Sequence, residues 1–459
     1  MPGLRSALGS HARSAILLSM LSALLGLAMN ATLARTLPRD DLGALFVLVS
    51  LIGVLATLAQ GGVLQPMLRQ ISVATPAGDA GSPAGCAAAS ALSASTAFSA
   101  ALLYLAFGYS IVCGAVLVLD SGFHSASSGP VSPFFGERGI PFKWLALWLL
   151  AVAVQGLVAE GFRALRLISR AYLFSGILVN AGVIAGVAGL MLFGNSGQFG
   201  PVLMVVVSIY SAVAILGLGL LQRCLPLSFA AVRLDMLTGL MRESLPILAF
   251  GLCVAILNQS DLWIVGWKFG ADSAGVYGAA VKLAVLAGIP AQISISFISP
   301  YVATLHAEGD PRRLQQVVQT TTALASLPSI GFFLLVCFAG QDILRMIYGP
   351  EFEEAKAVLM ILSAGHTIHV LFGPCGLALT LLGHGGLALR MTLVSTGFFT
   401  LMMFTLTPFG MTATAFGVAL TLMFHKALLW WSACQKLQLN TLAMFSGWRV
   451  FSRGVGGVQ

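Results

Sequence analysis

Long apolar stretches alternate with short polar breaks along nearly the whole chain. A helix of about 20 apolar residues is long enough to cross the hydrocarbon core of a bilayer. Twelve stretches meet this length, at roughly residues 14–34, 43–65, 86–119, 143–162, 173–194, 200–222, 245–267, 275–303, 316–340, 355–382, 387–408 and 411–433. The pattern predicts an all-α polytopic membrane protein with about 12 transmembrane helices, the first of them retained rather than cleaved as a signal peptide.

Composition and motifs narrow the function. Of 459 residues, 58% are hydrophobic and 9% are charged, whereas soluble domains carry about 25% charged residues. The seven cysteines lack a CxxC pair, and no phosphate-binding loop or hydrolase motif occurs. We therefore expect no cofactor, no metal site, no nucleic-acid partner and no enzymatic activity.

Lys and Arg are distributed unequally between the polar breaks on the two sides of the predicted membrane. They accumulate on the cytoplasmic side of membrane proteins. One side has seven, namely Arg35, Arg39, Arg138, Lys143, Lys268, Arg345 and Lys356. The other has sixteen, namely Arg5, Arg13, Arg69, Arg163, Arg166, Arg170, Arg223, Arg233, Arg242, Arg312, Arg313, Arg390, Lys426, Lys436, Arg449 and Arg453. The bias predicts that both termini are cytoplasmic.

Two segments half a chain apart are similar. Residues 34–51 (ARTLPRDDLGALFVLVSL) align with residues 266–283 (GWKFGADSAGVYGAAVKL) at a constant offset of 232. Six helices return the chain to its starting side, so the pattern predicts two six-helix bundles related by a parallel repeat. The expected domains are an N-terminal bundle (1–224), a cytoplasmic linker (225–244), a C-terminal bundle (245–434) and a cytoplasmic amphipathic tail (435–459).

Two ionisable residues, Asp261 and Lys282, lie inside apolar stretches. Such residues are costly in hydrocarbon and usually face the interior of a helix bundle. They are either substrate-binding residues of an aqueous lumen or a structural ion pair. Weaker candidates for the lumen are Asn258, Gln292, Ser296, Asn30 and Asn180; the alternative for Asn30 and Asn180 is hydrogen bonding between helices.

Three arginines recur at helical spacing at the end of the fourth stretch. Arg163, Arg166 and Arg170 are three and four residues apart, which predicts one face of an interfacial helix. They either anchor the topology or capture a headgroup at the cytoplasmic entrance. His366 and His369 also share a helical face, and packing at a cavity wall is favoured over proton relay or metal binding. Pro290 is expected to kink the eighth helix.

Three motifs occur along the chain, namely ARTLPRDDLGALFVLVSLIG, D-x-x-I-V-G followed by GVYGAAVKL, and ISPYVATLHAEGDPRRLQQ. Together they resemble the polysaccharide transporter family, the lipid-linked oligosaccharide (O-antigen type) flippases of the multidrug/oligosaccharidyl-lipid/polysaccharide exporter superfamily. The matching positions are Arg35, Gly43, Asp261, Gly266, Gly275, Tyr277, Ala280, Pro300, Gly309 and Asp310. The resemblance extends from the first helix to about Leu437.

The resemblance implies two six-helix bundles around a central cavity that opens alternately to either side. It implies transport of an undecaprenyl-diphosphate-linked oligosaccharide, a repeat unit of a polysaccharide, from the inner to the outer leaflet of a bacterial inner membrane. Glycosyltransferases and a polysaccharide polymerase of the same pathway are the expected partners. The alternative is a cation-coupled drug or small-metabolite antiporter of the same superfamily. A membrane glycosyltransferase or polymerase is disfavoured because the predicted loops are short.

Overall fold

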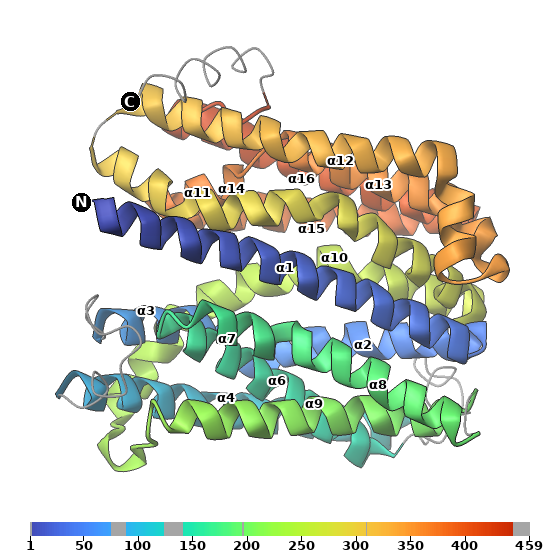
Figure 1. The fold of residues 1–459 in the computed structure, drawn as a ribbon, viewed down its shortest axis with the longest axis horizontal. Coiled ribbons are helices and arrows are strands. Elements are labelled where there is room, and N and C mark those ends of the chain that lie inside the picture. Colours follow the sequence, from blue (N-terminus) through green and yellow to red (C-terminus); the bar gives the residue numbers. More distant parts are fainter. Residues whose placement is uncertain (1, 75–88, 124–140, 195–196, 309, 444–459) are drawn as a thin grey trace. The chain divides into compact units, whose positions relative to one another are not determined.

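The computed structural model describes residues 2–74, 89–123, 141–194, 197–308 and 310–443 (Figure 1). These residues are almost entirely helical and contain no β-strand. By compactness the chain divides into two units. Unit 1 comprises Met1–Gln259 with Gly270–Asp272, and unit 2 comprises Ser260–Phe269 with Ser273–Gln459.

Unit 1 consists of long apolar helices that pack side by side, among them α6 against α9, α2 against α4, and α1 against α8. Pro38 precedes α2, and Gly61 ends it in a left-handed conformation, as is common at helix C-termini. The elements are α1 (Pro2–Thr36), α2 (Arg39–Gln60), α3 (Leu64–Ala74), α4 (Ala89–Phe123), α6 (Phe142–Ala164), α7 (Ile168–Tyr172), the π-helix η1 (Leu173–Ile177), α8 (Leu178–Leu192), α9 (Phe199–Gln222), the 3₁₀-helix η2 (Phe229–Ala231) and the first part of α10 (Leu234–Ala284).

Unit 2 has a similar construction, with α12 packed against α11 and α13, and α16 against α13 and α15. Asp310 caps α12 by accepting a hydrogen bond from the Arg313 backbone N–H at 3.0 Å. After the second part of α10, the elements are η3 (Val285–Gly288), α11 (Ile289–Ala307), α12 (Pro311–Ile347), η4 (Pro350–Ala355), α13 (Lys356–Leu371), α14 (Cys375–Leu379), the π-helical η5 (Thr380–His384), α15 (Gly385–Leu406), η6 (Thr407–Phe409) and α16 (Met411–Leu437).

The described residues contain ten helical segments that are long and apolar enough to cross a membrane. One of them, Leu234–Ile295, has 62 residues, about three times the length that a crossing needs. It is interrupted at Gly270, whose backbone is not helical (φ 89°, ψ 171°). The 16-residue α13 occupies another predicted crossing. The prediction of an all-α, multi-pass membrane protein is therefore confirmed.

The helix is irregular directly before Pro290, where the sequence predicts a kink. The four residues before α11 form the 3₁₀-helix η3, and Pro290 is the second residue of α11, where a missing N–H is tolerated. The irregular turn is held from the side, because the buried Ser329 hydroxyl on α12 donates a hydrogen bond to the Ala287 carbonyl at 2.7 Å. The 3₁₀ turn is therefore supported by a side-chain contact within unit 2.

A close backbone contact joins the turn after α2 to the first part of α10 in unit 1. Gly62 has a φ of 78°, a conformation that residues with a Cβ rarely adopt. A Cβ at this position would lie 2.7 Å from the Leu248 nitrogen and closer still to the Ser244 carbonyl oxygen. Both neighbours are backbone atoms, so only glycine fits.

Candidate functional site

The most buried carboxylate of unit 2 is that of Asp261, which is 3% exposed. The buried Tyr277 hydroxyl donates a hydrogen bond to Asp261 Oδ2 at 2.9 Å. In a continuous helix, residues 16 positions apart would be separated by about 24 Å. The hydrogen bond therefore requires the chain to reverse between them, and the break at Gly270 provides the reversal.

Lys282, five residues after Tyr277, belongs to the same cluster. Its charge interacts with the Asp261 carboxylate, which is compatible with either of the two roles considered for this pair. Asp261 Oδ1 is buried without a hydrogen-bond donor among the described residues. Burying a carboxylate oxygen without a hydrogen bond costs free energy. Asp261 Oδ1 therefore keeps the capacity to accept a further hydrogen bond or to bind a cation. We call Asp261, Tyr277 and Lys282 the α10 cluster.

The sequence repeat places no similar cluster in the first half. With the offset of 232, Asp261 corresponds to Met29 (261 − 232), Tyr277 to Leu45 (277 − 232) and Lys282 to Ser50 (282 − 232). The Ser50 hydroxyl is used locally, donating to the Val47 carbonyl at 2.8 Å. The ionisable chemistry is thus restricted to the second copy.

The other lumen candidates of the second half lie in different surroundings. Asn258 is exposed, and its Nδ2 donates to the Val254 carbonyl of the preceding turn at 2.7 Å. Gln292 is exposed on α11. Ser296 is part of α11, but its side chain lies outside the described residues.

The asparagine candidates of the first half make backbone contacts. Asn180 on α8 donates to the Ser22 carbonyl of α1 at 3.2 Å, the contact expected of a residue that holds two helices together. Asn30 donates within α1 to the Gly26 carbonyl at 2.8 Å. The buried Gln155 of α6 donates to the Phe174 carbonyl at 2.7 Å, and Phe174 lies in the π-helix η1, where the wider turn frees carbonyl groups.

The prediction that Arg163, Arg166 and Arg170 share one helical face is wrong. Helix α6 ends at Ala164, and Arg166 adopts a left-handed conformation with a φ of 59°. The chain turns there, and α7 begins at Ile168 with Arg170 on it. Periodicity of charge alone could not reveal this break, since no glycine or proline marks it.

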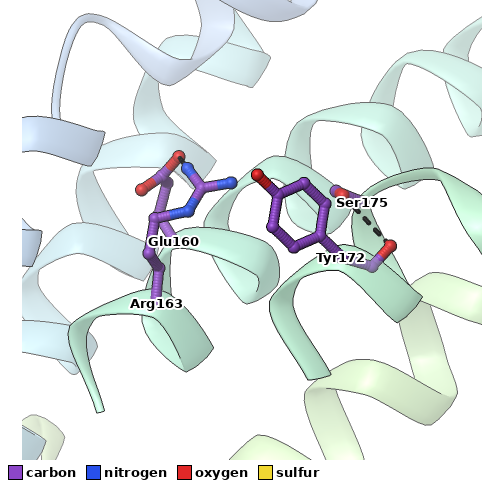
Figure 2. Close-up of polar contacts among 4 residues, drawn as sticks. All are labelled: Glu160, Arg163, Tyr172 and Ser175. Carbon is purple, nitrogen blue, oxygen red and sulfur yellow. Dashed lines mark hydrogen bonds and ion pairs between the residues drawn. The ribbon is translucent and has the colours of Figure 1, made fainter. Parts of the chain in front are cut away.

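Arg163 is paired within its own helix. Figure 2 shows its guanidinium on the Glu160 carboxylate, one turn earlier on α6, and between that carboxylate and the Tyr172 side chain of α7. On the other side of that ring, the Ser175 hydroxyl donates to the Tyr172 carbonyl at 3.2 Å. Arg166 and Arg170 are exposed. Of the three arginines, Arg166 and Arg170 therefore present their charge to the surroundings, whereas Arg163 is paired with Glu160.

Lys426, which the sequence pattern counted among the cytoplasmic basic residues, lies inside α16 instead. It is eleven residues before the end of the helix (437 − 426) and 8% exposed. Removing it leaves fifteen basic residues against seven (16 − 1), so the bias persists. His369 on α13 and His425 on α16 interact electrostatically with Lys426, and His366 on α13 interacts with His369. The described residues hold no group of three or more metal-ligating side chains.

Comparisons with known proteins agree with this architecture. Residues 246–406 match the MatE family model. A probable low-salt glycan biosynthesis flippase, Agl15 of Haloferax volcanii, is 25% identical over 138 residues. That match covers 29% of this chain and 29% of the length of the relative.

Solved structures resemble the chain over nearly its whole length. An inward-facing multidrug resistance MATE family transporter of the MOP superfamily has a TM-score of 0.68 at 12% identity, covering 93% of this chain and 98% of that one. The lipid II flippase MurJ has a TM-score of 0.67 at 11% identity, with coverages of 91% and 87%. A MOP superfamily transporter from Pyrococcus furiosus has 0.61 at 13%, with coverages of 93% and 94%. Residues 246–406 of the chain therefore match the MatE model, and the chain has the fold seen in these solved transporters.

Proposed function

We propose that this protein is a flippase that moves an undecaprenyl-diphosphate-linked oligosaccharide from the inner to the outer leaflet of a bacterial inner membrane. The observation that carries the proposal is the α10 cluster, a buried acid beside a half-buried lysine on otherwise apolar helices of a MOP-type fold. A lipid diphosphate is anionic, and a lysine inside the protein supplies the positive charge that shields it from hydrocarbon. The weak relation to a glycan flippase supports the same substrate class.

The mechanism we propose is alternating access between the two six-helix bundles, residues 1–224 and 245–434, joined by the linker 225–244. Lys282 binds the diphosphate while Asp261 competes for the lysine and promotes release. Tyr277 holds the Asp261 carboxylate in position. The exposed Arg166 and Arg170 then attract the headgroup at the cytoplasmic entrance, with Arg163 restrained by Glu160.

The direct test is to deplete the protein in its host and follow the lipid-linked oligosaccharide. We expect the intermediate to accumulate on the cytoplasmic leaflet, where a periplasmic enzyme such as a ligase or polymerase cannot reach it. The measurement is the fraction of lipid-linked glycan accessible to a membrane-impermeant glycosidase in right-side-out vesicles. Full accessibility in depleted cells would contradict the proposal. A total amount of intermediate no lower than in undepleted cells serves as the control for synthesis.

A cation-coupled drug or metabolite antiporter is the second candidate. The Asp261 carboxylate favours the antiporter, because its Oδ1 accepts no hydrogen bond from the described residues and could bind a cation or a proton. The test is drug accumulation in a strain lacking its other exporters. Efflux that requires a sodium or proton gradient, together with normal glycan export after depletion, would establish the antiporter instead.

The membrane orientation gives a further prediction. Because of the Lys and Arg bias, we expect both termini and residues 163–170 to face the cytoplasm. The test uses a reporter that is active only in the periplasm. It is expected to be active when it is inserted within residues 121–141 or at Glu351–Glu354. Residues 124–140 and the tail after residue 443 lie outside the described residues. A cytoplasmic signal at either insertion would contradict the twelve-helix topology.

A further inference from the structure

Unit 2 contains a second buried charge on an element that the α10 cluster does not use. Lys426 of α16 is 8% exposed, and its Nζ donates to the Gly373 carbonyl at 3.3 Å. Among the described residues, none of the ion pairs includes Lys426. An ammonium group has three N–H donors, so this contact leaves donors for another acceptor.

The titratable side chains that interact with Lys426 add no negative charge. They are His369 of α13 and His425 of α16, with the Cys375 thiol of α14 beside them. His366 of α13 interacts in turn with His369. His369 Nδ1 is buried without a hydrogen-bond partner in the part of the chain that the structure describes. His425 Nδ1 is 3.0 Å from the Ser395 hydroxyl of α15. We call Lys426, His366, His369 and His425 the α16 cluster.

The acceptor that holds Lys426 is itself fixed in place. Gly373 has a φ of 73°, and a Cβ there would lie 2.5 Å from both Thr322 Oγ1 and the Thr441 carbonyl oxygen. The chain after α16 returns to this loop, where the Thr441 hydroxyl donates to the Phe372 carbonyl at 2.7 Å. The Ala443 N–H donates to the Leu371 carbonyl at 2.9 Å. These contacts fix the loop that contains Gly373, and so the acceptor of the Lys426 hydrogen bond lies in a tightly packed segment.

A buried ammonium without a counter-charge costs several kcal/mol, and a paired one costs much less. The basic side chains of the α16 cluster come from two helices, so a ligand with several acceptor oxygens satisfies them better than a single carbonyl does. We propose that the α16 cluster binds a phosphate-class oxyanion, with Lys426 and His369 as its donors. The source is either the phosphate of a lipid headgroup or free phosphate, and this inference does not depend on flipping.

The test measures the thermal unfolding of the purified full-length protein in detergent, with increasing inorganic pyrophosphate or sodium chloride at equal ionic strength. A ligand that binds the folded state raises the unfolding temperature in a saturable way. We expect this rise with pyrophosphate and not with sodium chloride. A second arm compares undecaprenyl diphosphate with uncharged undecaprenol. A response to the lipid at lower concentration than to pyrophosphate identifies the headgroup as the source, whereas a response to pyrophosphate alone identifies the free ion.

The variants are Lys426→Met and, as a matched control on the same helix, Lys436→Met, since Lys436 is exposed. Lys426→Met is expected to weaken pyrophosphate binding at least tenfold, and Lys436→Met to leave it unchanged. If Lys426→Met does not fold, His369→Asn carries the test with the same expected weakening. A wild-type protein that responds to pyrophosphate no more than to sodium chloride would overturn the proposal, as would unchanged binding in the folded variant. Neither result would affect the flipping test, which measures transport.

Discussion

Replacing Lys282 with alanine is expected to abolish glycan export while the protein remains in the membrane at its normal level. The variant removes the positive charge of the α10 cluster. Hydrogen bonds to charged groups contribute about 1.5–3 kcal/mol, so the affinity for the anionic headgroup falls by roughly tenfold to hundredfold. Asp261→Asn is expected to impair export less, because the amide still accepts the hydrogen bond from Tyr277. The measurements are surface glycan by antibody or lectin binding and membrane level by immunoblotting.

Lys268 provides a matched control for Lys282. It lies on the same element but is exposed, so Lys268→Ala should retain export. The competing explanation is a purely structural ion pair. In that case Lys282→Ala and Asp261→Asn would both be degraded. A charge-swapped variant carrying Asp261→Lys and Lys282→Asp would then recover both level and export, and the proposed role in binding would be wrong.

The second large effect is expected at Gly62. Gly62→Ala should lower the free energy of unfolding by about 2–4 kcal/mol, since it combines an unfavourable φ with a backbone clash. The clash cannot be relieved by rotating a side chain, because the Cβ meets the backbone of Ser244 and Leu248 on α10. The measurement is the thermal unfolding temperature in detergent, together with the yield of monodisperse protein.

Gly194 separates the two causes. Its φ of 74° is close to the 78° of Gly62, but no heavy atom lies within 4 Å of an added Cβ. Gly194→Ala therefore carries only the conformational cost, about 1–2 kcal/mol. Equal losses in the two variants would show that the close approach between the α2–α3 turn and α10 contributes nothing to stability.

Hydrophobic patterning predicted the helices well, because the length of an apolar run is set by the thickness of the bilayer. It also indicated Asp261 and Lys282, since ionisable residues are rare in such runs. Tyr277 was not predicted as a partner of Asp261. A tyrosine blends with the apolar residues around it, and only the reversal at Gly270 brings the two together.

Other features depend on backbone geometry that composition does not encode. The left-handed Arg166 breaks the expected arginine face, and arginine is not a residue that signals such a turn. Lys426 was assigned to a polar break because lysine usually lies in one, yet its helix continues for eleven further residues (437 − 426). The apolar ALLWW run that follows Lys426 could have indicated that this lysine lies inside a buried part of the helix.

The π-helix η1 determines how α8 meets its neighbours. It adds one residue to a turn, so everything after Ile177 is rotated by about 100° relative to an uninterrupted α-helix. In this register Asn180 reaches the Ser22 carbonyl of α1, and Gly182 faces α9, where a Cβ would lie 2.8 Å from Ile209 Cγ2. Losing one residue from Leu173–Ile177 would therefore turn the whole of α8 about its axis. The length of this short segment, as much as its composition, is under structural constraint.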